Sequence, residues 1–354
     1  MKCAVFDHYL KIQATSEVAA CCTMKGHPWF GSIDALYSSQ WYADTKLKFD
    51  RDEWPPECVR CQVMESDGHV SRRIGANARV YGDHTVVPDG YWLDVNLNHV
   101  CNAACPMCSE QKSSMISGLK GIPVREFSSL SVLRALDYSK IFRISLSGGE
   151  TSVGKTSEVF LEEVRKMPNL ASLEMVTNGG RPIPKIREVL ALGKPTSVLL
   201  SMDGIGSSFE YSRWPIKWDD FVATSSYYKD LRNEFSNLRL SISAVITVLN
   251  IDQVTNIRDF AKEYDFGIAI LPLSLPSELA MVGNNVVTRA MRNCKMELLT
   301  HELTLPIATD EYDNTEELRD FITRNDQLRG ISIWDYLPNV ASLLYGIGNQ
   351  KVTY

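Results

Sequence analysis

Residues 99–110 read HVCNAACPMCSE and place three cysteines, Cys101, Cys105 and Cys108, within eight positions. They follow directly on YWLDVNLN (91–98), whose alternation of apolar and polar residues is typical of a strand. Three thiolates on one short loop can converge on a metal and leave one coordination position open. Soft sulfur ligands select iron–sulfur clusters, zinc or copper(I), so the loop predicts a metal centre at the end of a strand. A zinc site built from the three cysteines and His99 is the alternative.

The composition of the 354-residue chain is that of an ordinary globular protein of two or three compact units, with 44% hydrophobic and 23% charged residues. No window approaches eighteen apolar residues, and the N-terminal stretch MKCAVFDHYLKIQ has no apolar core. We therefore expect neither a membrane span nor a signal peptide. The expected compartment of the protein is a reducing cytoplasm. Nine cysteines in that compartment are more typical of metal ligands than of disulfides. The net charge of −6 disfavours nucleic acid as the main partner.

Strand and helix patterns alternate from about residue 90, which predicts βαβ crossovers and a parallel sheet. The expected helices carry apolar residues three and four positions apart. Because no GxGxxG follows the first strand, we favour a barrel or partial barrel over a dinucleotide-binding fold. The expected strands are 91–98, 141–149, 170–180, 196–204, 238–250 and 266–276, and the expected helices are 157–167, 182–193, 220–235 and 252–264.

The predicted fold class is α/β, with a partial (β/α)6 TIM-like barrel over 89–295. A small cysteine-rich domain (1–88) precedes the barrel, and a helical closing segment (296–354) follows it. In barrels of this type chemistry is carried out at the carboxyl ends of the strands. The residues with chemical potential fall there, because Cys101, Gly148 to Glu150, Asn178 and Asp203 each follow an expected strand.

The spacing CxxxCxxC of Cys101, Cys105 and Cys108 resembles the signature of the radical S-adenosylmethionine (SAM) enzymes. The resemblance implies that the three thiolates hold a [4Fe–4S] cluster whose open iron binds the amino and carboxylate groups of SAM. It further implies cleavage of SAM to methionine and a 5′-deoxyadenosyl radical, which abstracts hydrogen from a substrate. The three cysteines are accordingly the expected catalytic and metal-ligating residues.

Motifs at the later strand ends also resemble those of this family. Residues 144–151, ISLSGGET, look like its GGE motif, in which glycines allow close approach of a ligand and the glutamate meets the SAM ammonium. The segments TNGG (177–180) and SMDG (201–204) resemble those that contact the ribose and methionine of SAM, and Arg213 matches an arginine that pairs with the SAM carboxylate. Ordinary Asn-Gly and Asp-Gly turns and a surface arginine are the alternatives. The implied cofactor-binding residues are Gly148, Gly149, Glu150, Asn178, Ser201, Asp203, Arg213 and Asn250.

The N-terminal cysteines look like a second metal site. Neighbouring residues of an extended chain point to opposite sides, so we expect one of Cys21 and Cys22 to be a ligand, and both are candidates. With GSIDAL (31–36) and Trp41, the pattern resembles a twitch/SPASM auxiliary module, as in twitch-type radical SAM proteins of phages, which implies one auxiliary [4Fe–4S] cluster. Such modules commonly follow the barrel, whereas this one precedes it. A structural zinc site is the alternative, and Cys294 is expected to be a buried apolar thiol. The candidate ligands are Cys3, Cys21, Cys22, Cys58 and Cys61.

The resemblance implies an enzyme with oxidoreductase or lyase chemistry that acts on a peptide or protein side chain and receives electrons from a flavodoxin or ferredoxin. The auxiliary module motivates the peptide substrate, since related enzymes use it to accept an electron or to anchor the substrate. A small-molecule, nucleotide or tRNA substrate is the second hypothesis, although basic and aromatic residues are not clustered in the way RNA binding favours. A binding or scaffold protein whose cysteines hold zinc is the third.

Overall fold

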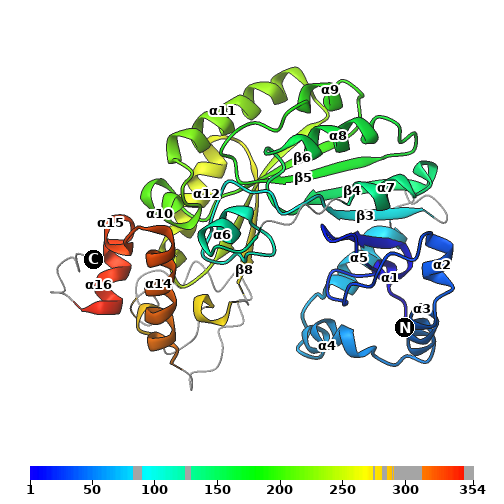
Figure 1. Cartoon of the computed structure of the whole chain (residues 1–354), viewed down its shortest axis with the longest axis horizontal. Helices are drawn as coiled ribbons and strands as arrows, with labels where there is room; N and C mark the ends of the chain where they lie inside the picture. Colours follow the sequence, from blue (N-terminus) through cyan, green and yellow to red (C-terminus); the bar gives the residue numbers. More distant parts are fainter. Residues whose placement is uncertain are drawn as a thin grey trace. The chain divides into compact units, whose positions relative to one another are not determined.

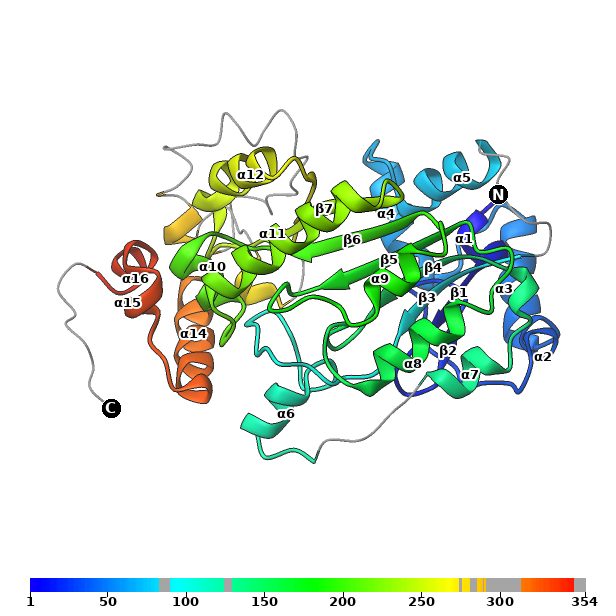
Figure 2. The same ribbon diagram turned by 90° about the horizontal axis from the view of Figure 1, so that it is seen from above.

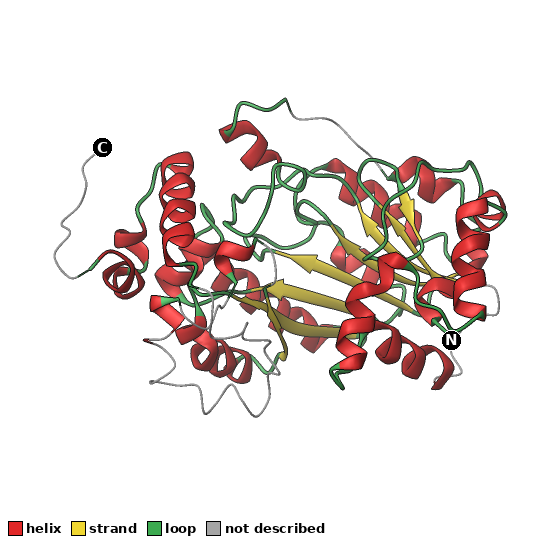
Figure 3. Cartoon of the chain, turned by 90° about the horizontal axis from the view of Figure 1, so that it is seen from below, coloured by secondary structure: helices red, strands yellow, loops and turns green. Residues whose placement is uncertain are grey.

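The computed structural model describes residues 1–82, 90–123, 129–273, 276–280, 285–288, 290 and 313–346. Figure 3 shows the helices in red and the strands in yellow. They alternate along the chain from β3 to β8, and the strand order is β2-β1-β3-β4-β5-β6-β7-β8. The chain forms two compact units, which are described separately. Unit 1 comprises Met1–His99, Arg125–Val176 and Ile183–Ser197, and unit 2 comprises Val100–Val124, Thr177–Pro182 and Val198–Tyr354.

The strands of unit 1 are mostly parallel. β2 runs antiparallel to β1, whereas β1, β3, β4 and β5 pair in parallel. Leu10, Leu93, Ile144 and Leu173 lie opposite one another across these four strands and are almost fully buried. Each such side chain contributes about 1.5–3 kcal/mol when it is removed from water, so this row forms the centre of the core of unit 1. The strands are β1 (Tyr9–Ile12), β2 (Val18–Ala19), β3 (Tyr91–Asn96), β4 (Ile141–Ser147) and β5 (Ser172–Thr177).

The helices of unit 1 fall into two groups. In Figure 1, α7, α8 and α9 lie on one side of β4 and β5, whereas α1 to α5 gather around β1. Side-chain caps start two of the second group, because Ser32 accepts from the Ala35 N–H and Ser39 from the Tyr42 N–H. The first group is α7 (Leu130–Arg134), η2 (Tyr138–Lys140), α8 (Lys155–Val164) and α9 (Ile186–Leu190). The second is α1 (Ala4–His8), α2 (Ile33–Tyr37), α3 (Gln40–Asp50), η1 (Pro56–Cys58), α4 (Val59–Ser66) and α5 (Arg72–Gly82).

Unit 2 contains the parallel pair β7 (Leu238–Ile246) and β8 (Gly267–Pro272), and β6 (Thr196–Ser201) leads into it. Helices α10, α14, α15 and α16 lie together (Figure 2), around a core that includes Leu318, Ile322 and Val340. The helices are α6 (Ser114–Leu119), α10 (Gly206–Ser212), α11 (Trp218–Glu234), η3 (Ile251–Gln253), α12 (Val254–Glu263), η4 (Ser277–Leu279), α14 (Thr315–Arg329), α15 (Ile333–Tyr336) and α16 (Pro338–Tyr345).

The predicted α/β class is confirmed, with a mostly parallel sheet of eight strands. All six predicted strands form, and β1 and β2 add to them. The helix predicted over 182–193 is reduced to α9, because Pro184 precedes it and Lys185 has the left-handed φ of 57°. The helical patterns at 314–328 and 332–344 form α14 to α16, whereas Cys294 and 297–303 lie outside the described residues. The partial barrel and the boundaries between the three expected domains stay predictions.

Within the residues that the structure describes, no helix combines the length and the apolar composition that crossing a bilayer requires.

Candidate metal and cofactor sites

The three-cysteine loop belongs to unit 2 and is built largely without regular secondary structure. Cys105 is buried, and Cys101 and Cys108 are half-buried. The Cys108 N–H donates to the Cys105 carbonyl over 3.0 Å, which closes a tight turn between the second and third thiols. Burial raises the pKa of the Cys105 thiol to about 11, against the lowering influence of Arg213, and also raises that of Cys108. A metal that binds these sulfurs must therefore displace their protons.

Two adjacent serines fix the first part of the loop. Ser113 caps α6 through the Ile116 N–H, and its hydroxyl donates to the Ala103 carbonyl at 2.6 Å. The Ser114 hydroxyl accepts from the Cys101 N–H at 3.0 Å and donates to the Cys101 carbonyl at 3.2 Å. The start of α6 thus holds the backbone on which the first thiol is mounted.

A buried ion pair lies beside the loop. Arg213 Nη2 lies 2.6 Å from Asp203 Oδ2, and Arg213 Nη1 lies 3.9 Å from Cys105 Sγ. Burial raises the pKa of the Asp203 carboxyl, while Arg213 and the Val245 N–H oppose that rise. Burial disfavours the charge on Arg213, but Asp203 and Cys105 outweigh it, so the pKa of Arg213 is raised. Asp203 and Arg213, both predicted to bind the cofactor, thus lie next to each other, and Arg213 contacts the predicted metal ligand Cys105.

The two predicted asparagines of unit 2 are buried and hydrogen-bonded. Asn178 Nδ2 donates to Asn102 Oδ1 over 2.8 Å, which connects the loop after β5 to the three-cysteine loop. Asn250 Nδ2 donates to the Asp203 and Val245 carbonyls, and its Oδ1 accepts from the Thr247 N–H. Asn250 therefore connects the loops that follow β6 and β7, and the predicted contacts of both residues with SAM stay predictions.

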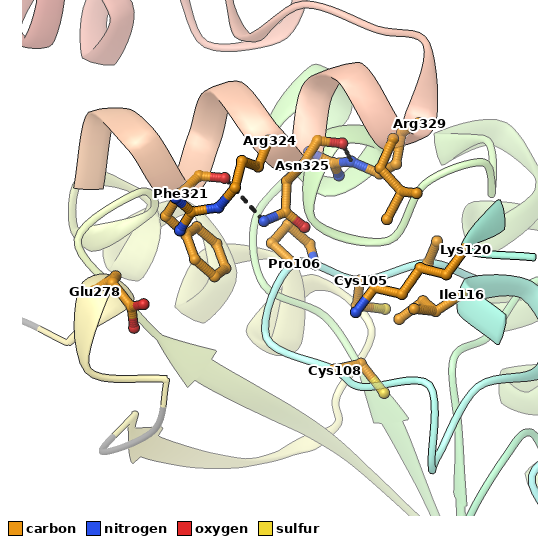
Figure 4. A pocket seen from close by; sticks show the side chains of 12 residues that line it. Cys105, Pro106, Cys108, Ile116, Lys120, Glu278, Phe321, Arg324, Asn325 and Arg329 are labelled. Atoms are coloured by element: carbon orange, nitrogen blue, oxygen red, sulfur yellow. Dashed lines mark hydrogen bonds between the residues drawn. The ribbon is translucent and has the colours of Figure 1, made fainter. Parts of the chain in front are cut away.

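A cavity of about 380 Å³ opens next to the thiols of Cys105 and Cys108. Figure 4 shows Phe321, Arg324 and Asn325 of α14 along its other side, and Asn325 Nδ2 donates to the Phe321 carbonyl at 2.9 Å. A space of this size lies within the range of small-ligand sites in proteins. Helix α14 thus contributes to the surroundings of the loop, which the sequence patterns had not indicated.

The predicted glycine-rich motif lies in unit 1, directly after β4. Gly148 has a φ of +82°, and a Cβ at this position would lie 2.7 Å from that of Asn96 on β3. A side chain at residue 148 is therefore excluded by both backbone conformation and space. Glu150 is 4% exposed, and its carboxylate accepts from the Ser152 N–H at 2.8 Å. The motif forms a tight turn that ends in a buried carboxylate.

Four of the N-terminal cysteines meet in unit 1. Cys3, Cys21, Cys58 and Cys61 line one cavity of about 10 Å³, although up to 58 positions separate them in the chain. Burial, aided by the neighbouring thiolates, raises the pKa of Cys58 to about 12, and burial raises that of Cys3 to about 11. Phe6, Phe49, Trp54, Arg72 and Arg73 are among the other residues of the wall. We call this arrangement the four-thiol pocket.

The doublet divides between two environments. Cys21 lines the four-thiol pocket and is buried, whereas Cys22 is half-buried and does not line it. A hydrogen bond from Cys22, supported by Thr23, lowers the pKa of Cys21 and raises that of Cys22. Cys21 is therefore the better placed and the more acidic of the two candidate ligands.

The donor chemistry of both sites fits soft metals. None of the eight described cysteines is in a disulfide, and thiolates select iron–sulfur clusters or zinc. Among the described residues, however, no group of three or more cysteine, histidine or carboxylate side chains is arranged to hold a single ion. The four-thiol pocket has room for about one water molecule, so metal loading there requires its side chains to move. Two of the three loop thiols, those of Cys105 and Cys108, in contrast border a cavity of about 380 Å³.

Several residues that shape these sites were not predicted from the sequence. Ser113 and Ser114 carry a recognisable signal, since two serines directly before an apolar run are typical of a helix start. No such signal marks Asn102, Trp214 or the residues of α14, because their contacts join distant parts of the chain. The Trp214 carbonyl, for example, accepts from the Ala104 N–H at 2.7 Å.

Together, the fold and the two thiol sites define an α/β protein with three free cysteines on the loop that follows β3. Among solved structures, it is similar to native anSMEcpe with bound AdoMet, with 17% identity and a TM-score of 0.39 over 73% of this chain and 67% of that one. A second structure, of native anSMEcpe with bound AdoMet and Cp18Cys peptide, has 18% identity and a TM-score of 0.38 over the same shares. No protein-family model and no curated protein matches the chain.

Proposed function

We propose that this chain is a radical SAM enzyme whose three-cysteine loop holds a [4Fe–4S] cluster. The observation that carries the proposal is the loop itself, in which Cys101, Cys105 and Cys108 share eight positions after β3. A bound cluster of this kind supplies the electron that cleaves SAM to methionine and a 5′-deoxyadenosyl radical. The protein supplies three soft ligands, a cavity of about 380 Å³ beside two of them, and a buried cation next to Cys105.

The residues after the strands are proposed to bind SAM. In unit 2, Asn178, Ser201 and Asn250 are at most 8% exposed and belong to loops or strand ends that the chain fixes by hydrogen bonds. In unit 1, the turn of Gly148, Gly149 and Glu150 ends in a buried carboxylate.

We propose that the four-thiol pocket holds an auxiliary [4Fe–4S] cluster with Cys3, Cys21, Cys58 and Cys61 as ligands. The convergence of these four thiols supports a metal, and the resemblance to twitch modules supports a cluster rather than zinc. Metal analysis separates the two, since iron and sulfide in equal amounts indicate clusters and zinc without sulfide indicates a structural ion.

Anaerobic reconstitution with iron and sulfide tests the proposed activity. The reconstituted chain should form 5′-deoxyadenosine from SAM when dithionite is added, and the Cys105→Ala variant should form none above the protein-free control. Cys22→Ala is the matched control, because it removes a cysteine that lines neither described cavity. Full iron and sulfide loading without 5′-deoxyadenosine would overturn the proposal.

We further propose a peptide or protein side chain as the substrate and a flavodoxin or ferredoxin as the electron donor. The auxiliary module motivates the first, since in related enzymes it accepts an electron or anchors the substrate. A pool of peptides should stimulate formation of 5′-deoxyadenosine and yield products of altered mass, whereas a tRNA pool should not. Stimulation by tRNA alone would replace the peptide by the second hypothesis.

A further inference from the structure

In the buried ion pair with Asp203, the guanidinium of Arg213 also contacts Cys105, a proposed cluster ligand. The two terminal nitrogens of Arg213 divide between two partners, since Nη2 meets Asp203 Oδ2 at 2.6 Å and Nη1 donates to Cys105 Sγ at 3.9 Å. The side chain of Asp203 is fully buried and that of Arg213 is 13% exposed. A cationic N–H is thus directed at a sulfur in a region from which water is largely excluded.

The protein fixes both ends of this arrangement. The Val245 N–H donates to Asp203 Oδ1 at 2.8 Å, so the carboxylate is anchored to β7. At the other end, the Ala104 N–H donates to the Trp214 carbonyl at 2.7 Å. The residue before Cys105 is thereby tied to the residue after Arg213, and the donor and the thiol are held in register by backbone as well as side-chain contacts.

Stability alone is a poor account of this pair. Taking two charges out of water costs several kcal/mol, and apolar residues of similar volume are often as stabilising as a buried ion pair. Hydrogen bonds and charge around a sulfur ligand do, however, set the reduction potential of an iron–sulfur cluster. A cation beside the thiolates favours the reduced cluster, which carries one more negative charge.

We propose that Arg213, held by Asp203, is a positioning residue that donates to Cys105 and raises the reduction potential of the cluster on the three-cysteine loop. This inference deepens the proposed function and rests on it. It assigns to Arg213 a partner different from the SAM carboxylate that the sequence resemblance implies. The two roles give different experimental results.

Three variants of the full-length chain test the inference: Arg213→Gln, Arg213→Lys and Asp203→Asn. Each is reconstituted anaerobically, and its reduction potential is measured without SAM by titration monitored by electron paramagnetic resonance. The signal that changes when SAM is added afterwards identifies the loop cluster. Arg319→Gln is the control, because Arg319 pairs with Glu316 on α14 and its described contacts include no cysteine.

Arg213→Gln should shift the potential of the loop cluster to more negative values, because the cationic donor is lost. Asp203→Asn should shift it to more positive values, because the charge of Arg213 is then less balanced. Arg213→Lys should give an intermediate shift, since a single ammonium keeps the charge but cannot span both partners as the guanidinium does. Affinity for SAM should change less than twofold in all three.

Unchanged potentials in variants that assemble the cluster would overturn the inference, and weakened SAM binding in the same variants would assign Arg213 to the SAM carboxylate instead. If Arg213→Gln does not fold, as judged by circular dichroism, the comparison of Arg213→Lys and Asp203→Asn with the unmodified chain decides. Failure of the unmodified chain to assemble any loop cluster would instead count against the proposed function.

Discussion

The two thiol sites differ in how far apart their cysteines lie in the sequence. In unit 2, three cysteines lie on one loop of eight positions, and two of them, Cys105 and Cys108, border a cavity of about 380 Å³. In unit 1, four cysteines come from three separate segments of the first 61 residues, with Cys58 and Cys61 on the same one, and close around a cavity of about 10 Å³. One site is local and open, whereas the other is assembled by tertiary folding and nearly filled.

This difference teaches what supports each site. The loop is held by hydrogen bonds between protein groups, including those of Ser113, Ser114 and Ala104. The four-thiol pocket lies among short helices and an aromatic cluster in which Phe6 stacks on Tyr42 at 4.4 Å. Where ligands come from separate segments, the free energy of metal binding is also free energy of folding. We therefore expect metal to matter for activity in unit 2 and for stability in unit 1.

The largest expected effect is that of Cys105→Ala on activity. Removal of one loop thiol should abolish formation of 5′-deoxyadenosine and lower the bound iron from about eight to about four atoms per chain, because one [4Fe–4S] cluster is lost and the other is retained. Iron quantification and the SAM cleavage assay check this. A variant with all of its iron would show that the loop does not hold a cluster.

The next effect separates the members of the doublet. Cys21→Ala should lose the metal of the four-thiol pocket and lower the midpoint of thermal unfolding by roughly 10 °C, because a metal contributes several kcal/mol to folding and 1 kcal/mol corresponds to about 2–4 °C in a unit of this size. Cys22→Ala should keep both the metal and the midpoint. The measurements are metal content and differential scanning calorimetry, and the reverse result would make Cys22 the ligand.

A smaller effect is expected for the network that supports unit 2 without metal. The Tyr211 hydroxyl donates to Asp326 Oδ1 at 2.8 Å, and Asp326 also pairs with Arg329 and accepts from the Ile333 N–H. Tyr211→Phe removes one of these hydrogen bonds and should lower the free energy of unfolding by about 1 kcal/mol.

Urea denaturation of the metal-free protein checks this value. Tyr227→Phe is the control, since the described contacts of Tyr227 are with the ring of Tyr228. Equal losses for the two variants would show that the Tyr211 network does not support unit 2.

The smallest effect concerns a surface ion pair of unit 1. A hydrogen bond from Lys166 lowers the pKa of Glu163 despite its burial, and Arg134 and Tyr138 add to this. Because the folded state favours the charged carboxylate, the contribution to stability is present above the ordinary glutamate pKa of about 4.3 and is lost as the pH falls through the lower folded value. Lys166 and Arg134 are more than half exposed, so Glu163→Gln should cost under about 1 kcal/mol at neutral pH.

Urea denaturation at neutral pH and at about pH 3 tests the sign, since the difference between Glu163→Gln and the unmodified chain should shrink on acidification. A difference that grows at low pH would contradict the ion-pair account. A loss of stability as large as that of Cys21→Ala would also contradict the comparison of the two sites, because surface ion pairs would then stabilise unit 1 as strongly as a metal does.

Much of the fold follows from local pattern. The alternation in residues such as Leu93, Val95, Ile144 and Leu146 predicts strands with one buried face, and these residues are all at most 1% exposed. β1 falls in the strand-like run after Cys3, but α1 occupies the first part of that run, and the parallel pairing of β1 with β3 spans some 80 positions. Pairing at that distance leaves no local signal.

The candidate sites show the same limit. Cysteine spacing alone predicted a site on the loop of Cys101, Cys105 and Cys108. The number of N-terminal cysteines predicted that four thiols of that segment would come together, and four line one cavity. The contact of Arg213 with Cys105 and the position of Arg324 beside the cavity depend on how loops and α14 pack, which a one-dimensional pattern does not encode. That Cys21 rather than Cys22 lines the four-thiol pocket likewise depends on tertiary packing.

The parallel pairing of β1 with β3, and of β3 with β4, has a consequence for the protein during its synthesis. Ribosomes add about 5–20 residues per second, so roughly 6–23 s separate Cys61 from the end of β5 at Thr177. For that interval the early thiols exist on a nascent chain that lacks most of its sheet, open to oxygen and to stray metal ions. We therefore expect the proposed auxiliary cluster to be the first of the two proposed clusters that is lost in cells short of iron or grown with vigorous aeration.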